Sequence, residues 1–62
     1  MAFHQCFTRK SDRQMYCSAQ TFKDHDSAAT WISQCLAHFG IRGDDVGQRT
    51  QCESPPAKAI VW

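Results

Sequence analysis

The feature that most constrains this chain is a single apolar stripe at helical spacing. At 100° per residue the stripe fills an arc of roughly 140°, and its members are Ala28, Trp31, Ile32, Cys35, Leu36 and Phe39. Asp24 or Asp26 can cap the start, and Gly40 can supply a left-handed stop after which Ile41 folds back onto the last turn. The sequence therefore predicts one amphipathic helix over 27–39, with one face to bury against another element.

The partner of that helix must be small. Leu, Ile, Val and Phe together number ten in 62 residues, and two Trp, four Phe and one Tyr supply much of the apolar area. A chain of this length has room for a single domain, 1–62, and none for a separate catalytic domain. The net charge of +1, from seven basic and six acidic residues, is too balanced to indicate a nucleic-acid surface or an acidic DNA mimic.

A β-hairpin is predicted over 2–22, with strands at 2–9 and 14–22 joined by a polar loop. The four-residue loop 10–13 makes paired positions sum to 23. This register places Cys6 opposite Cys17, Phe7 opposite Tyr16, Thr8 opposite Met15 and His4 opposite Ala19. One face of the hairpin then carries Phe3, Phe7, Tyr16 and Phe22, and the other carries His4, Cys6, Met15, Cys17 and Ala19.

Two further strands are predicted after the helix. A glycine-rich loop at 42–47 precedes a weak polar strand at 48–53, and Ser54-Pro55-Pro56 breaks the chain before an apolar strand at 57–62. The predicted fold class is α+β: a small antiparallel sheet in β-β-α-β-β order, covered on one face by a single amphipathic helix. We expect the aromatic face of the hairpin to pack on the helix, because the chain has few other large apolar residues.

The sequence predicts neither catalysis nor a cofactor. Asp24-His25-Asp26-Ser27 contains the residue types of a hydrolytic triad, but neighbours in sequence do not form the required hydrogen-bonded line. The three glycines lack the Lys-Ser/Thr that a phosphate-binding loop needs. We therefore expect a protein that is not an enzyme.

The four cysteines are predicted to be reduced thiols that bind no metal. The first residues do not form a secretory signal, which favours a cytoplasmic, reducing compartment, and no apolar run approaches the ~20 residues that cross a membrane. One alternative is a zinc site, which requires the small-residue hairpin face to meet the helix; its ligands would be Cys6, Cys17, Cys35 and His38. The absence of Cys-x-x-Cys spacing argues against zinc. A cross-strand Cys6–Cys17 disulfide is another alternative.

Both faces of the hairpin are partly apolar, whereas one helix covers only one of them. The uncovered face predicts a contact surface for a protein complex or for a second copy of the chain in a homodimer. The candidate partner-binding residues are a polar rim of Arg9, Lys10, Arg13, Asp44 and Asp45, with Met15 or Tyr16 as an apolar anchor. The alternative is a nucleic-acid-binding domain, in which bases stack on the aromatic hairpin face beside the basic residues.

In its layout the whole chain resembles small phage-encoded host-takeover proteins such as anti-CRISPR proteins. The resemblance lies in the hairpin, the Trp31-bearing helix and the further strands within 62 residues, without a shared motif. It implies an inhibitor or regulator that blocks a larger host macromolecular complex in the host cytoplasm. It carries over no site residues, and the balanced charge departs from the acidic DNA mimics among these proteins.

Overall fold

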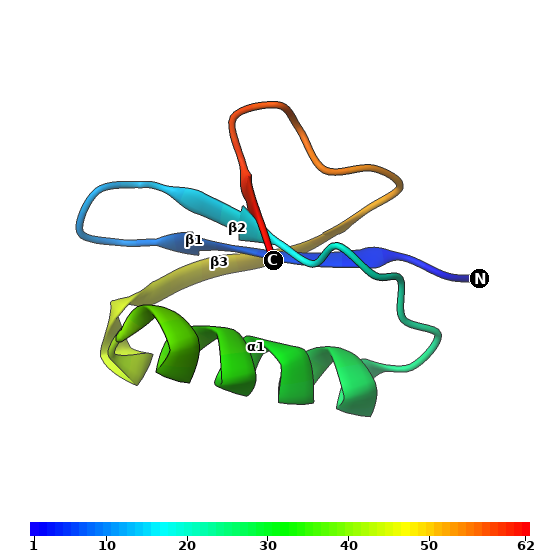
Figure 1. Cartoon of the computed structure of the whole chain (residues 1–62), viewed down its shortest axis with the longest axis horizontal. Helices are drawn as coiled ribbons and strands as arrows, with labels where there is room; N and C mark the ends of the chain where they lie inside the picture. Colours follow the sequence, from blue (N-terminus) through cyan, green and yellow to red (C-terminus); the bar gives the residue numbers. More distant parts are fainter.

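A helix and a four-stranded sheet form two layers in the computed structural model, which describes residues 1–62 (Figure 1). The elements in chain order are β1 (His4–Arg9), β2 (Met15–Cys17), α1 (His25–Phe39), the 3-10 turn η1 (Gly43–Asp45), β3 (Val46–Cys52) and β4 (Ile60–Val61). The α+β class and the single covering helix are confirmed. No helix in the structure has the length and apolarity that crossing a membrane requires.

Helix α1 begins two residues earlier than predicted because Asp24, and not Asp26, is its N-cap. The Asp24 side chain accepts a hydrogen bond from the Ser27 amide at 2.8 Å. This satisfies one of the backbone donors that a helix start leaves unpaired. Asp26 lies in the first turn, where its negative charge faces the positive end of the helix dipole.

The end of α1 follows the prediction. Gly40 has a left-handed backbone with φ of 68°, and its amide donates to the Leu36 carbonyl. The Ile41 amide donates to the same carbonyl at 2.8 Å, and the Ile41 side chain is buried in the core. The left-handed residue turns the chain back, so that an apolar residue just past the helix packs onto the last turn.

The strand order is β3-β1-β2-β4. The predicted hairpin register is confirmed for the pairs Cys6–Cys17, Phe7–Tyr16 and Thr8–Met15. Strand β3 pairs antiparallel with the other side of β1. Strand β4, however, runs parallel to β2, so the sheet is mixed and the prediction of an antiparallel sheet is wrong. The chain between β3 and β4 crosses the face of the sheet opposite α1 and returns in the same direction (Figure 1), as a parallel pair requires.

The pairing of His4 with Ala19 is not formed. The Ala19 amide instead donates to the Trp62 carbonyl at 3.0 Å. Further along, Phe3 pairs with Phe22. The residue numbers of this pair add up to 25, whereas those of the predicted register add up to 23, so the register has shifted by two residues. The second strand of the hairpin is therefore shorter than the predicted 14–22. The backbone ladder with β1 stops at Ser18, because the Gln5 amide donates to the Ser18 hydroxyl in place of the Ser18 carbonyl, and that carbonyl faces the His4 side chain.

The core lies between the sheet and α1. Phe7 stacks on Tyr16 with ring centroids 5.1 Å apart, and Phe7 lies 6.0 Å from the Trp31 ring. Phe22, Ala28, Ile32, Cys35, Ile41 and Val46 complete this buried cluster, against which Phe3, Leu36 and Phe39 pack. The aromatic face of the hairpin therefore faces the helix, as predicted. This removes the platform on which the nucleic-acid alternative depended, because Phe7 is fully buried and Tyr16 is only 3% exposed.

The opposite face of the sheet is covered as well, contrary to the prediction. Cys6 and Cys17 point away from α1 and yet are fully buried. The segment 53–59 passes over this face (Figure 1), and its Pro55, Pro56 and Ala59 are half-buried. The prolines that mark a break in the sequence thus belong to a segment that covers the sheet.

We expect Gly40→Ala to lower the free energy of unfolding by about 1 kcal/mol, because an alanine is strained in the left-handed region. A Cβ would meet nothing within 4 Å at Gly40, so the loss would come from the backbone alone. Gly43→Ala is the matched control, since its Cβ also meets nothing and its φ is not positive. Urea unfolding of both variants measures the difference, and an equal loss in the two would contradict this account of the cap.

Candidate functional site

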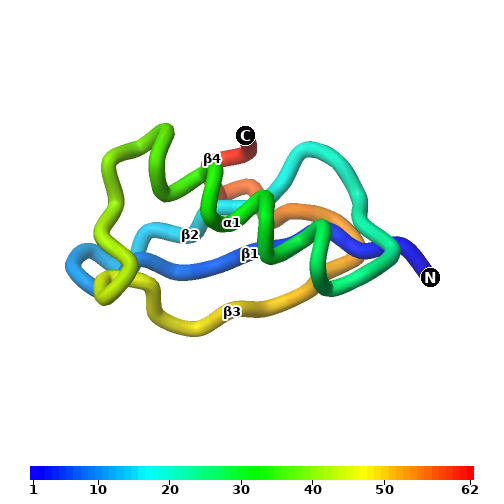
Figure 2. Tube along the Cα trace, turned by 90° about the horizontal axis from the view of Figure 1, so that it is seen from below, coloured from blue at the N-terminus to red at the C-terminus, as the bar shows by residue number.

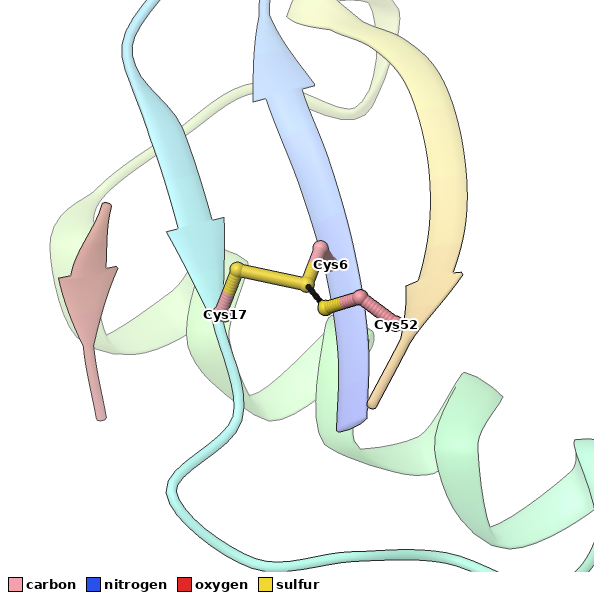
Figure 3. Close-up of side chains that lie close together, drawn as sticks. All are labelled: Cys6, Cys17 and Cys52. Carbon is pink, nitrogen blue, oxygen red and sulfur yellow. Dashed lines mark hydrogen bonds between the residues drawn. A yellow bond between two sulfur atoms is a disulfide. The ribbon is translucent and has the colours of Figure 1, made fainter. Parts of the chain in front are cut away.

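Three cysteines from three strands converge on the face of the sheet opposite α1. Cys6 lies on β1, Cys17 on β2 and Cys52 at the end of β3. Cys6 is directly opposite Cys17, whereas Cys52 is opposite His4 and so lies diagonal to Cys6 on the same face. The three sulfur atoms all lie within 4.8 Å of one another, with that of Cys6 between the other two (Figure 3).

The structure joins Cys6 and Cys17 in a disulfide and leaves Cys52 as a thiol. The Cys52 Sγ lies 2.9 Å from the Cys6 Sγ and 3.9 Å from the carbonyl oxygen of His4. The prediction that all four cysteines are reduced is therefore wrong for this structure, and the cross-strand disulfide alternative describes it. The physical reason is the register, which holds the Cα atoms of Cys6 and Cys17 only 4.1 Å apart.

The predicted alternative zinc site does not form, because its ligands lie on opposite sides of the sheet. Cys35 belongs to the core between the sheet and α1. His38 is exposed at the last turn of α1, where its ring stacks on Trp62 at 4.7 Å. Cys52, the third member of the cluster, was not among the predicted ligands. Its signal would have been the pairing of His4 with Cys52, which places two same-face cysteines on neighbouring strands.

Cys35 is an inert thiol. It is fully buried, and this burial raises its pKa to about 11 because a thiolate is poorly solvated in an apolar core. The thiol therefore stays protonated at neutral pH, and its role is that of a small apolar residue in the helix–sheet interface.

His4 is the nitrogen donor nearest in register to the cluster. Its Nδ1 lies 2.9 Å from the Ser18 carbonyl oxygen. Because a carbonyl oxygen only accepts, Nδ1 carries the proton, and Nε2 of the neutral ring is left with a free lone pair. The side chain is half-buried on the same face as Cys6.

The predicted polar rim divides into separate groups. The Arg9 guanidinium makes a two-pronged contact with Asp12 and lies 5.8 Å from the ring centre of Tyr16. Since Tyr16 is almost fully buried beneath it, the prediction that Tyr16 anchors a partner is wrong. Met15 is half-buried, and Arg13 is exposed with a left-handed φ of 60°.

The other rim residues lie on two neighbouring turns at one end of the molecule (Figure 2), and Asp45 and the Lys10 backbone join these turns. The Asp45 carboxylate accepts hydrogen bonds from the amide and the hydroxyl of Ser11, at 3.0 and 2.9 Å. The Lys10 amide donates to the Asp45 carbonyl at 2.7 Å. Asp44 forms an exposed ion pair with Arg42. Asp45 thus has a structural role between the β1–β2 turn and η1, while the side chains of Lys10 and Asp44 face water.

A shallow groove of about 620 Å³ lies between α1 and β3. Strand β3 runs along one side of the sheet, beside α1 (Figure 2). The lining residues of the groove are Gln5, His25, Ala29, Ile32, Arg49, Thr50 and Gln51. The His25 Nδ1 lies 3.1 Å from the amide nitrogen of Gln51. His25 and Arg49 are the two ionisable residues of this lining, which contains no carboxylate and no cysteine.

Comparisons of the chain with family models, with curated proteins and with solved structures find no match.

We expect Asp12 to titrate with a pKa of about 2, since the Arg9 guanidinium holds it below the usual 3.8. The Arg9–Asp12 contribution to stability is then fully present above pH 4 and is lost as the pH falls through about 2. Carboxyl NMR of Asp12 in Arg9→Gln is expected to show a higher pKa, whereas Arg42→Gln, which removes a cation that pairs with Asp44 instead, leaves it unchanged. An Asp12 pKa that Arg9→Gln does not move would refute the assignment.

We also expect Cys35 to resist alkylation in the folded, reduced protein. With its pKa at about 11, only about one thiol in a thousand is ionised at pH 8. Timed alkylation followed by peptide mass spectrometry should label Cys52 first and Cys35 last, and urea should abolish the difference. Equal labelling of the two in the folded protein would show that Cys35 is not enclosed.

Proposed function

We propose that the chain is a non-enzymatic protein-binding module, an inhibitor or regulator that blocks a larger host macromolecular complex, and that the open edge of β4 receives an extended strand of its partner. One observation carries this proposal. Ile60, Val61 and Trp62 are consecutive, large and apolar, and their exposed fractions are 39%, 49% and 38%. They form the outermost strand of the sheet and the residue that follows it.

The backbone of β4 supports this mode of binding. The Trp62 amide donates to the Cys17 carbonyl, and the Trp62 carbonyl accepts from the Ala19 amide. Because peptide groups alternate in direction along a strand, the amide and carbonyl of Val61 point away from β2. An edge with free backbone groups and apolar side chains is the usual template for adding a strand from another protein.

Basic residues border this edge and favour a partner segment with acidic flanks. The Gln14 side chain, beside the exposed Arg13, donates to the Lys58 carbonyl at 3.1 Å and so holds the start of β4 against the hairpin. Arg13 and Lys58 both face water. Arg13 of the predicted rim and the half-buried Met15, the predicted apolar anchor, thus lie beside β4 along β2. Lys10 and Asp44 belong to the polar end formed by the β1–β2 turn and η1.

The absence of catalysis is part of the proposal. Support comes from the α1–β3 groove, whose single histidine contacts the Gln51 side chain and has neither a carboxylate nor a cysteine among the other lining residues. A rigid domain that occupies a surface needs no such group. The inhibitory role itself has its support in the chain's layout, which resembles small host-takeover proteins.

The test is affinity capture from host lysate with the chain and two Val61 variants. Val61→Pro removes the outward amide without removing a bond to β2, since proline is tolerated on edge strands at such positions. Val61→Thr keeps the amide and the branched shape, and is the matched control. We expect the chain and the threonine variant to retain a stoichiometric protein complex, and the proline variant to bind it about tenfold more weakly or worse.

Circular dichroism of the three proteins establishes that all are folded. Equal capture by the proline variant would exclude the β4 edge as the binding surface. Recovery of nucleic acid in place of protein, or of a second copy of the chain alone, would overturn the proposal that the target is a larger protein complex.

A further inference from the structure

We propose that the reduced chain binds a thiophilic divalent cation, zinc, on the thiolates of Cys6, Cys17 and Cys52. The disulfide alone does not account for the third sulfur. Cys52 comes from a different strand than the bonded pair and yet brings its Sγ to 2.9 Å from the Cys6 Sγ. Three sulfurs that converge from three strands are the arrangement that a thiolate metal site needs.

The distances suit a zinc ion once the disulfide is open. Zinc–sulfur bonds of about 2.3 Å place the sulfurs of a tetrahedral site about 3.8 Å apart. The three sulfurs here lie within 4.8 Å of one another. Side-chain rotations that move each sulfur by about an ångström would bring them to the spacing of a zinc site. Soft sulfur donors favour zinc over magnesium or calcium, which take oxygen ligands.

The surroundings provide the other features of such a site. Cys6 and Cys17 are fully buried, whereas Cys52 is half-buried and lines a surface cleft with Phe3 and Glu53, which gives an ion a path of entry. His4 adjoins the cluster on the same face, with Nδ1–H directed at the Ser18 carbonyl. Histidines that bind zinc through Nε2 commonly make this kind of bond with the other nitrogen. The fourth position then belongs to a water molecule, or to His4 after its side chain moves, since its ring nitrogens are not part of the group of ligand atoms within 4.8 Å of one another.

The disulfide and the metal exclude each other, so the occupancy follows the redox state. A dithiol reductant passes two electrons and two protons to the Cys6–Cys17 bond, yields two thiols and itself becomes a disulfide. Binding of the divalent ion then displaces the protons of the three thiols. In the oxidised chain the sulfur atoms link β1 covalently to β2 and leave β3 without such a link. The metal-bound chain would have β1, β2 and β3 joined at one point.

The experiment is a titration with Co²⁺ alone, followed by Zn²⁺, of protein kept reduced and free of oxygen. We expect one Co²⁺ per chain, a strong near-ultraviolet thiolate-to-cobalt absorption and its loss when zinc displaces the cobalt. Cys52→Ser should weaken metal binding by more than about 100-fold. Replacing a residue that only hydrogen-bonds to a metal ligand already lowers metal affinity by about 10- to 100-fold, and Cys52 would be a ligand itself. Cys35→Ala is the matched control, because Cys35 lies on the other side of the sheet, and it should bind as the unaltered chain does.

Cys52→Ser retains the Cys6–Cys17 pair, so its oxidised form provides a folded reference for circular dichroism. The oxidised, unaltered chain should bind no cobalt. The proposal fails if the reduced chain takes up no stoichiometric cobalt, if Cys52→Ser binds as tightly as the unaltered chain, or if Cys35→Ala loses binding to the same extent.

Discussion

The packing of Phe7 and Tyr16 beneath Trp31 determines how the rest of the molecule is arranged. Side chains alternate between the faces of a strand, so turning these rings toward α1 turns their neighbours Cys6 and Cys17 to the opposite face. A flipped sheet would place the cysteines in the helix interface and leave the rings of Phe7 and Tyr16 in water. At ~25 cal/mol per Å² of apolar surface, that exposure would cost several kcal/mol, a large share of the stability of a small domain.

With the aromatic rings turned toward α1, the face of the sheet with the cysteines would be exposed to solvent, and segment 53–59 covers it. The face with the cysteines is apolar enough to need cover, and the chain has no second helix. The crossover from β3 to β4 lies over it instead, with half-buried prolines that need no hydrogen-bond partner for an amide. The molecule thus has three layers, although only two of them are regular secondary structure.

The parts of the fold that sequence reasoning recovered are those determined by neighbouring residues. The Gly40 stop, the apolar stripe of α1 and the Cys6–Cys17 register all depend on short spacings that a helix period or a tight turn defines. The parallel pairing of β4 and the place of Cys52 depend on strands that meet far along the chain. The residues of β3 do not themselves indicate whether this polar strand pairs with β1 or with β2. The sequence therefore did not show that Cys52 would join Cys6 and Cys17.

The route of the chain over the sulfurs also has a kinetic consequence. Strand β4 docks on β2, and segment 53–59 needs the finished face of β1, β2 and β3 beneath it, so both must be placed after the hairpin and β3 have paired. The β2–β4 pairs, like the β1–β3 pairs, join residues far apart in sequence, so closing each loop has a high entropic cost. The three sulfurs therefore stay open to solvent until segment 53–59 is in place, and lifting of this segment alone would expose them again.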